Sequence, residues 1–291
     1  MNHPRGTVVR RRGYLENDSA LLPVRVRGHG PGVILIPGGL ETAADFTRLA
    51  DRLAKSFTTF VVERRGRGAS RHLAAQPSID NEATDVIGVA RAMGVRYMFG
   101  HSSGALISLQ AAHLAPELID SIAVYEPPLP TAGYQDQFDW AGEVAQLIRE
   151  GRCSTALARM ISAVFFNGAL KRKPNIILRA AAAIALRWGR GTSGEALVDR
   201  LQAFTQDACI VDEARAMGIS VPEIRARVLL MSGFRMNEAL VAALDTLERE
   251  LPHVERVRIR GANHLGPTNS GRPKLVAVRL ADFYSRGERP V

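Results

Sequence analysis

Short runs of apolar and β-branched residues alternate along the chain with longer stretches whose apolar residues recur at helical spacing. The short runs predict strands and the longer stretches predict helices. Strands are expected at 24–27, 32–36, 58–63, 95–99, 121–125, 227–231 and 254–259, and helices at 43–55, 81–93, 105–114, 239–250 and 273–284. This alternation predicts an α/β protein with a mostly parallel sheet flanked by helices.

The β pattern is absent from one long segment. Between 130 and 221 the sequence has helical patterns only, for example at 143–150, 155–166 and 176–188. The strand at 121–125 ends in Glu126-Pro127-Pro128, and the two prolines prevent a helix from continuing there. We therefore expect a core formed by 1–129 and 222–291, with a helical lid, 130–221, inserted after that strand.

The composition is that of an ordinary globular protein. With 291 residues, 46% of them hydrophobic, the chain can bury one large core without disulfides. Cys153 and Cys209 are too few and too far apart for a disulfide framework or a metal cluster. No apolar run follows the arginine-rich N-terminus, and no segment reaches the ~18 apolar residues that span a bilayer. A cytoplasmic protein without a membrane partner is expected.

The formal net charge of +9 raises the question of nucleic-acid binding. The arginines are scattered along the whole chain, however, and aromatic residues make up only 6% of it. The densest basic run, Lys171-Arg172-Lys173, is expected to be a solvated turn of the lid. The charge therefore gives little support to a nucleic-acid partner.

One motif indicates chemistry. The residues Gly100-His101-Ser102-Ser103-Gly104 follow a predicted strand and precede a predicted helix. A sharp strand-to-helix turn of this kind exposes its central residue, and glycines stand where a side chain would block the bend. Ser102 is therefore the candidate nucleophile, and a plain turn serine is the alternative.

Further motifs carry a resemblance to a known family. A glycine turn follows an early strand, residues 65–70 read Arg-Gly-Arg-Gly-Ala-Ser, and Gly-Ala-Asn-His stands at 261–264. With the nucleophile turn, this order resembles the α/β-hydrolase superfamily and covers nearly the whole chain. Residues 101–105 and 125–128 resemble in particular a bacterial branch of small serine hydrolases, similar to zearalenone-type lactone hydrolases. In those enzymes the acid follows the strand after the nucleophile helix.

A nucleophilic serine needs a base within hydrogen-bond reach and a third group that orients the base. His264 is the candidate base, because its loop follows the last strand, where the base of this fold stands. His101 adjoins Ser102 and is expected to pack or to line the pocket. The other histidines lack such a context: His3, His29, His72, His113 and His253.

The acid departs from the superfamily pattern. The usual aspartate would stand about three residues beyond Gly233, where this chain has Met236. Glu126 instead follows the strand at 121–125, at the carboxyl edge of the sheet where α/β folds bind ligands. We predict that Glu126 is the acid, with Glu238 or an unidentified acid as alternatives.

Backbone amides must stabilise the oxyanion of an acyl-transfer reaction. The N–H of Ser103 is one candidate, and the resemblance implies Gly39 as the second, unless the glycines at 38–39 serve only a turn. Residues 65–70 lack the lysine of a phosphate-binding loop and are expected to be structural. Metal-binding motifs are absent from the sequence, so no metal or cofactor is expected.

Taken with the resemblance, these residues predict a serine hydrolase that cleaves an ester or lactone of a medium-sized apolar molecule. Ser102 would attack the carbonyl, His264 would carry the proton and Glu126 would orient His264. Substrate contacts are expected from Leu40, His101, Trp140 and Trp188.

Other activities stay open at this stage. The same fold hosts C–C bond hydrolases, thioesterases and cofactor-free cyclases or lyases, and a slow-turnover ligand-binding protein is a further alternative. Dehalogenase and epoxide-hydrolase chemistry is excluded, because both need aspartate at position 102. The expected partner is a small molecule, and a homodimer is compatible with the sequence. The lid decides the shape of the pocket, so the sequence does not reveal the substrate.

Overall fold

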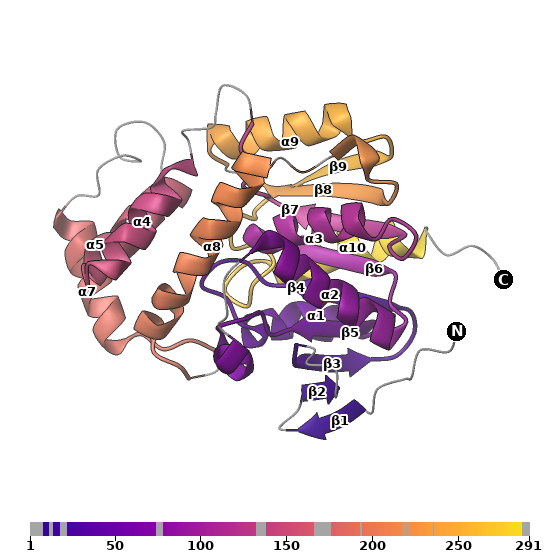
Figure 1. Ribbon diagram of the computed structural model, residues 1–291, viewed down its shortest axis with the longest axis horizontal. Coiled ribbons are helices and arrows are strands. Elements are labelled where there is room, and N and C mark those ends of the chain that lie inside the picture. Colours follow the sequence, from indigo (N-terminus) through magenta and orange to yellow (C-terminus); the bar gives the residue numbers. More distant parts are fainter. Residues whose placement is uncertain are drawn as a thin grey trace.

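The computed structural model describes residues 8–11, 14–17, 22–73, 78–131, 138–165, 176–192, 194–217, 219, 221–234 and 236–286. Its centre is a nine-stranded sheet, shown in Figure 1. In spatial order the strands are β1 (Val8–Arg11), β2 (Tyr14–Asn17), β3 (Val24–Gly28), β5 (Thr58–Val62), β4 (Gly32–Ile36), β6 (Tyr97–His101), β7 (Ser121–Tyr125), β8 (Arg227–Gly233) and β9 (Val254–Ile259). The pairs from β5 to β9 are parallel, and β1, β2 and β3 are antiparallel at one edge. The predicted fold class is confirmed.

The sheet contains all seven predicted strands and two that were not predicted. The unpredicted pair, β1 and β2, is short and includes charged residues, so it has no apolar run that would mark it in the sequence. Strand β6 begins two residues later than expected and extends to His101, which carries it directly into the nucleophile turn. In the register of the sheet, Ile36 lies beside Gly100 and His101 beside Tyr125. The carboxyl ends of β4, β6 and β7 therefore meet at one edge.

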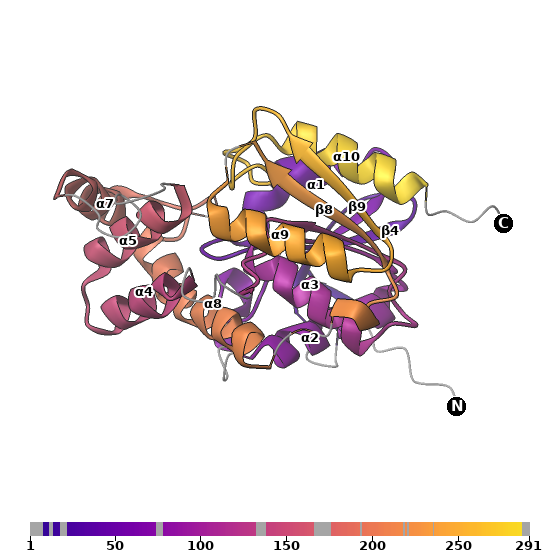
Figure 2. The same cartoon turned by 90° about the horizontal axis from the view of Figure 1, so that it is seen from above.

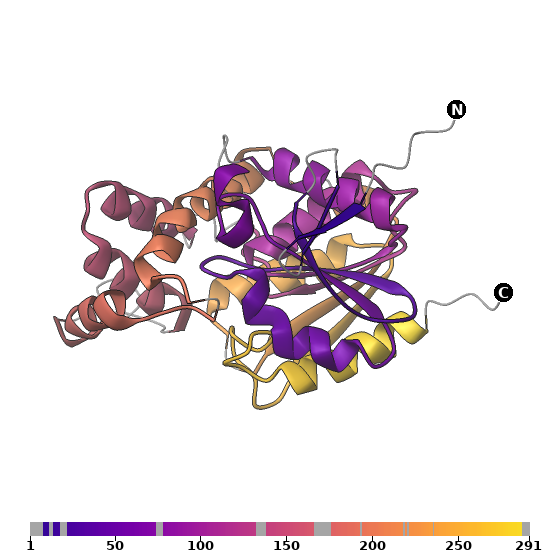
Figure 3. The ribbon, with the colours of Figure 1, turned by 90° about the horizontal axis from the view of Figure 1, so that it is seen from below.

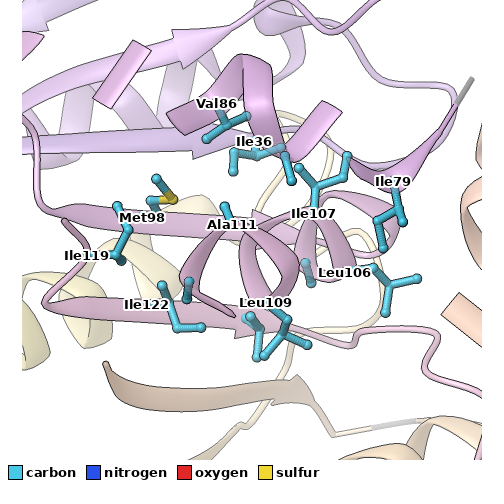
Figure 4. Close-up of a cluster of buried hydrophobic side chains, with 14 of the residues drawn as sticks. Ile36, Ile79, Val86, Met98, Leu106, Ile107, Leu109, Ala111, Ile119 and Ile122 are labelled. Carbon is cyan, nitrogen blue, oxygen red and sulfur yellow. The ribbon is translucent and has the colours of Figure 1, made fainter. Parts of the chain in front are cut away.

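Helices cover both faces of the sheet (Figure 2). One face packs against α2 (Ile79–Met93), α3 (Ser103–Leu114) and α9 (Glu238–Glu250), and the other against α1 (Thr47–Leu53) and α10 (Pro273–Ser285). The first face holds the larger core, in which Ile36 and Met98 of the strands meet Val86, Leu106 and Ile107 of the helices (Figure 4). This packing fixes the start of α3, and therefore the nucleophile turn, against the end of the sheet.

Four helices of the described chain lie between β7 and β8, inside the segment where a lid was predicted. They are α4 (Trp140–Arg149), α5 (Cys153–Phe165), α7 (Ile176–Trp188) and α8 (Leu197–Met217), and we call them the helical insertion. The insertion has a small core of its own and projects from one end of the sheet (Figures 1 and 3). Helix α8 was not predicted separately, because it has no single apolar face: it contacts α2 and α3 of the core as well as α4 and α7.

Three predictions concern regions outside the core. Cys153 and Cys209 are free thiols in α5 and α8. The run Lys171-Arg172-Lys173 lies outside the described residues. None of the helices in the described ranges combines the length and the apolar composition that crossing a membrane requires.

Candidate active site

Ser102 stands between β6 and α3 in a conformation that few residues adopt. Its φ is 52° and its ψ is −121°, and its N–H donates to the carbonyl oxygen of Tyr125 at 2.9 Å. Glycines permit the bend on both sides. A Cβ on Gly104 would lie 2.4 Å from the carbonyl oxygen of Ile36, and a Cβ on Gly100 would lie 2.3 Å from that of Gly104. The structure thus holds Ser102 in a strained turn, as a nucleophile turn requires.

Glu126 and His264 are brought together although 138 positions separate them in the chain. The His264 Nδ1 lies 2.7 Å from Oε2 of Glu126, and Oε1 of Glu126 accepts the N–H of Gly233 at 2.8 Å. Glu126 is completely buried and has a φ of 48°, an uncommon backbone conformation for a residue other than glycine. A carboxylate held at both oxygens fixes the imidazole with Nδ1 protonated and Nε2 as the acceptor.

Ser102 and His264 line one cavity of about 50 Å³. Within the described residues no hydrogen bond joins the two side chains, and such bonds often form only when substrate binds. The rest of the wall is mainly apolar and comes from both the core and the insertion: Gly39, Ser103, Pro128, Phe138, Trp140, Ala141, Val164, Phe204, Asp207, Val211, Asn237 and Leu240. A small, mainly apolar ligand group therefore fits beside Ser102.

Two backbone amides of the cavity wall are candidate oxyanion donors. Ser103 is the first residue of α3, so its N–H has no partner within the helix and lies at the positive end of the helix dipole. The N–H of Gly38 is already bound to Oε2 of Glu41 at 2.6 Å. Gly39 is therefore the candidate second donor, as expected from the sequence, and its catalytic role stays a prediction.

His101 forms a buried ion pair behind the cavity. Its Nδ1 lies 2.9 Å from Oε2 of Glu41, and its Nε2 lies 2.8 Å from the carbonyl oxygen of His264. Since both partners are acceptors, both ring nitrogens must carry hydrogen, and the ring is an imidazolium. Burial lowers the pKa of His101, but the charge and hydrogen bond of Glu41, together with the charge of Glu126 and the hydrogen bond to the His264 carbonyl, raise it above the ordinary value. The same attraction lowers the pKa of Glu41 against the effect of its burial.

A second buried ionic cluster connects α8 to the nucleophile turn. Asp207 of α8 accepts from the Ser103 hydroxyl at 2.6 Å and from Nη1 of Arg64 at 3.0 Å, and it also pairs with Arg67. Arg64 in turn binds both carboxylate oxygens of Glu82, at 2.6 and 2.8 Å. Burial raises the pKa of Asp207, but the charges of Arg67 and Arg64 bring it below its usual value. Two arginines face two carboxylates, so the cluster is electrically balanced.

The four expected substrate contacts separate into two groups. Trp140 lines the cavity, where it stacks on Phe204 with ring centroids 5.9 Å apart. The other three do not line it: Trp188 is 74% exposed on α7, Leu40 packs against the core of the insertion, and His101 is buried in its ion pair. Trp188, Leu40 and His101 are therefore not part of this cavity, and their contact with a substrate stays a prediction. A linear pattern does not reveal which face of a helix or turn is directed at the cavity.

The alternative acid, Glu238, lies elsewhere. It is exposed at the start of α9 and lines a separate surface hollow with Met236. The neighbouring Asn237 is buried instead: its Oδ1 accepts the N–H of Leu240 at 2.9 Å and its Nδ2 donates to the carbonyl oxygen of Ala163 at 3.3 Å. The loop after β8 therefore contributes an amide, and not a carboxylate, to the cavity wall.

Sequence reasoning missed the buried polar residues around the site. They are Glu41, Arg64, Asp207 and Asn237, and a charge that becomes buried only through tertiary contacts has no linear signature. Arg67, which donates to the carbonyl oxygen of Gly38 at 2.5 Å, does lie in the loop at 65–70 that was expected to be structural. Among the described residues, no three or more His, Cys, Asp or Glu side chains cluster as metal ligands do.

Comparisons with known proteins agree with this geometry. The profile of the α/β-hydrolase fold family matches residues 31–267. A 2-(acetamidomethylene)succinate hydrolase from Mesorhizobium japonicum is 28% identical over 271 residues, covering 90% of this chain and 91% of that protein. An N-formylmaleamate deformylase from Pseudomonas putida is 30% identical over 126 residues, covering 40% and 46%. The solved structure of an α/β hydrolase from Sphaerobacter thermophilus is similar with a TM-score of 0.69 and 26% identity, covering 91% of this chain and 98% of that one.

Proposed function

Since the chain belongs to the α/β-hydrolase family, we propose that it is a serine hydrolase in which Ser102 is the nucleophile, His264 the base and Glu126 the orienting acid. The observation that carries the proposal is the 2.7 Å contact between Glu126 and His264, whose imidazole lines the same cavity as Ser102. A buried carboxylate on one ring nitrogen leaves the other nitrogen to act as a base.

The reaction follows from these positions. As the Ser102 oxygen attacks the substrate carbonyl, His264 takes the hydroxyl proton and the Glu126 carboxylate stabilises the imidazolium that forms. The amides of Gly39 and Ser103 bind the oxyanion of the tetrahedral intermediate. Collapse of that intermediate breaks the bond to the leaving group, which receives the proton from His264. Water then repeats the sequence on the acyl-enzyme, releases the acid and restores Ser102.

The cavity supports an ester with a short, uncharged acyl group as the substrate. Its volume of about 50 Å³ is roughly what three to five water molecules occupy. No lysine or arginine is among the described lining residues, and the charge of Asp207 is balanced by Arg64 and Arg67. A substrate carboxylate would find no cationic partner among these described lining residues and would lose its hydration. This substrate is smaller than the medium-sized molecule expected from the sequence.

The similarity to the Mesorhizobium protein supports a second candidate, hydrolysis of an amide in an acidic substrate. That candidate needs a cation in the cavity, and the balanced cluster at Asp207 makes it the weaker of the two. The narrower resemblance to lactone hydrolases stays a prediction, and so do C–C bond cleavage and thioester hydrolysis.

A substrate panel tests the proposal. We expect the purified protein to hydrolyse p-nitrophenyl acetate and butyrate faster than the octanoate, and faster than a small lactone or 2-(acetamidomethylene)succinate. Ser102→Ala should abolish this hydrolysis and labelling by a fluorophosphonate, because it removes the nucleophile and no core volume. Ser121→Ala is the matched control. Ser121 is a buried serine at the amino end of β7, whereas Ser102 follows the carboxyl end of β6. Labelling that persists in Ser102→Ala would contradict the proposal, and a preference for the succinate would favour the second candidate.

A further inference from the structure

Helix α7 lies at the outer end of the insertion (Figures 1 and 2), and several of its large apolar side chains are exposed. Ile176, Ile177, Ile184 and Trp188 are between 65% and 80% exposed, and they are the four most exposed large hydrophobic residues of the described chain. Positions 177, 181, 184 and 188 follow the spacing of one helix face. Single exposed apolar residues are ordinary, but a continuous apolar stripe marks an interaction surface.

The exposure of this face does not mean that α7 fails to pack against the rest of the protein. The opposite side of α7 is used: Ala182 is buried, and Leu178, Ala185 and Leu186 pack against the core of the insertion. The helix thus has two apolar faces, of which only one is covered by the described chain. Packing within the described part of the insertion therefore leaves the second face uncovered.

The charged residues of α7 itself are all arginines. Helix α7 contains Arg179 and Arg187 and no acidic residue, and Arg190 follows directly after it. The guanidinium of Arg187 lies 5.5 Å from the ring centroid of Trp188. An apolar stripe with arginines and a tryptophan is the pattern of a helix that lies in the interface of an anionic bilayer.

A second copy of the chain fits this surface less well. A two-fold contact places the same patch on both partners, so α7 would pack on α7. Helix α7 has two arginines and no carboxylate, so such a contact would join two positively charged helices without an ion pair between them.

We propose that α7 docks the protein on a membrane surface rich in anionic phospholipid, with its isoleucines and Trp188 in the interface and its arginines at the phosphates. The sequence expectation of no membrane partner was based on the lack of a spanning segment, and surface docking does not need one. Among the described helices of the insertion, α4, α5 and α8 line the active-site cavity and α7 does not, so docking and hydrolysis use different residues.

Vesicle cosedimentation with the full chain tests the proposal. We expect the protein to bind vesicles of phosphatidylcholine with phosphatidylglycerol at least about tenfold more strongly than pure phosphatidylcholine, with a loss at high salt. Ile177→Ser/Ile184→Ser should lower binding by about fivefold or more, and Arg179→Gln/Arg187→Gln should remove the preference for anionic lipid. Leu275→Ser/Val278→Ser is the control, because it removes two exposed apolar residues of α10 and should leave binding unchanged. Hydrolysis of a water-soluble ester should be the same in all four proteins.

Two outcomes would overturn the proposal. Equal binding by the wild type and the isoleucine variant would mean that the general positive charge of the protein, and not α7, attracts the vesicles. The second outcome is a wild type that does not bind vesicles and is a dimer in solution, with an isoleucine variant that is a monomer. This result would identify a second copy of the chain as the partner of α7. Size-exclusion chromatography with light scattering makes that distinction.

Discussion

Glu126 has an uncommon backbone conformation, and its carboxylate contacts the imidazole of His264. A φ of 48° is costly for a non-glycine residue, and here it directs the carboxylate to Nδ1 of His264 at 2.7 Å. We predict that Glu126→Gln lowers kcat by on the order of 10⁴-fold, because the amide no longer stabilises the imidazolium. Steady-state kinetics on p-nitrophenyl acetate measure this loss. Glu238→Gln serves as the control and should retain nearly full activity, since Glu238 is exposed away from the cavity. Comparable losses in both variants would count against Glu126.

The ion pair of His101 and Glu41 makes stability depend on pH. The pKa of His101 is raised above 6.5 in the folded state, so its contribution is complete below pH 6.5 and is lost as the pH rises through the folded value. The pKa of Glu41 is lowered below 4.5, so its contribution is present above pH 4.5 and is lost as the pH falls through the folded value. The pair therefore stabilises the fold most between these limits.

We predict that the difference in free energy of unfolding between the wild type and His101→Gln is largest near pH 6 and shrinks by about pH 9. Urea unfolding at the two pH values measures it. His253→Gln is the control, because His253 is exposed and its replacement removes no buried side chain. A difference that is constant with pH would mean that His101 contributes packing and not charge.

At the scale of elements, α8 lies in the insertion but is bound to the core by buried polar contacts. Asp207 on α8 binds Arg64, Arg67 and the hydroxyl of Ser103, whose amide is a candidate oxyanion donor. By contrast, α7 has one buried residue, Ala182. Movement of the insertion is therefore expected first in α7, while α8 remains on the core.

Removing the charge of Asp207 tests this connection. Asp207→Asn removes one of the two carboxylate charges that balance the buried Arg64 and Arg67. We therefore predict a loss of about 3–5 kcal/mol in the free energy of unfolding. Chemical denaturation measures the loss. Asp212→Asn, an exposed change on the same helix, should stay within about 0.5 kcal/mol of the wild type. Equal effects in the two variants would show that the cluster does not anchor α8.

At the scale of the whole molecule, the cavity exists only because the insertion meets the core. Trp140 comes from the insertion and stacks on Phe204 in the cavity wall, whereas Trp188 is remote from the cavity. We predict that Trp140→Ala raises the rate on p-nitrophenyl octanoate relative to the acetate by about tenfold, because a larger cavity admits a longer chain. Trp188→Ala should leave this ratio unchanged, and a parallel series of p-nitrophenyl esters measures it. A shift in both variants would mean that α7 closes over the substrate.

The sequence by itself determined the local structure and the residues of the nucleophile turn. Strand and helix patterns and the glycines around Ser102 depend on neighbours in the chain, so they can be read in one dimension. Glu126 and His264 were predicted from strands that end at the same edge of a parallel sheet together with the family resemblance, and the structure brings their side chains into contact. Which side chains face the cavity was decided by tertiary structure alone. The burial of Glu41, Arg64 and Asp207, and the outward position of Trp188, depend on how the insertion packs on the core, and contacts between distant segments leave no periodic signal in the sequence.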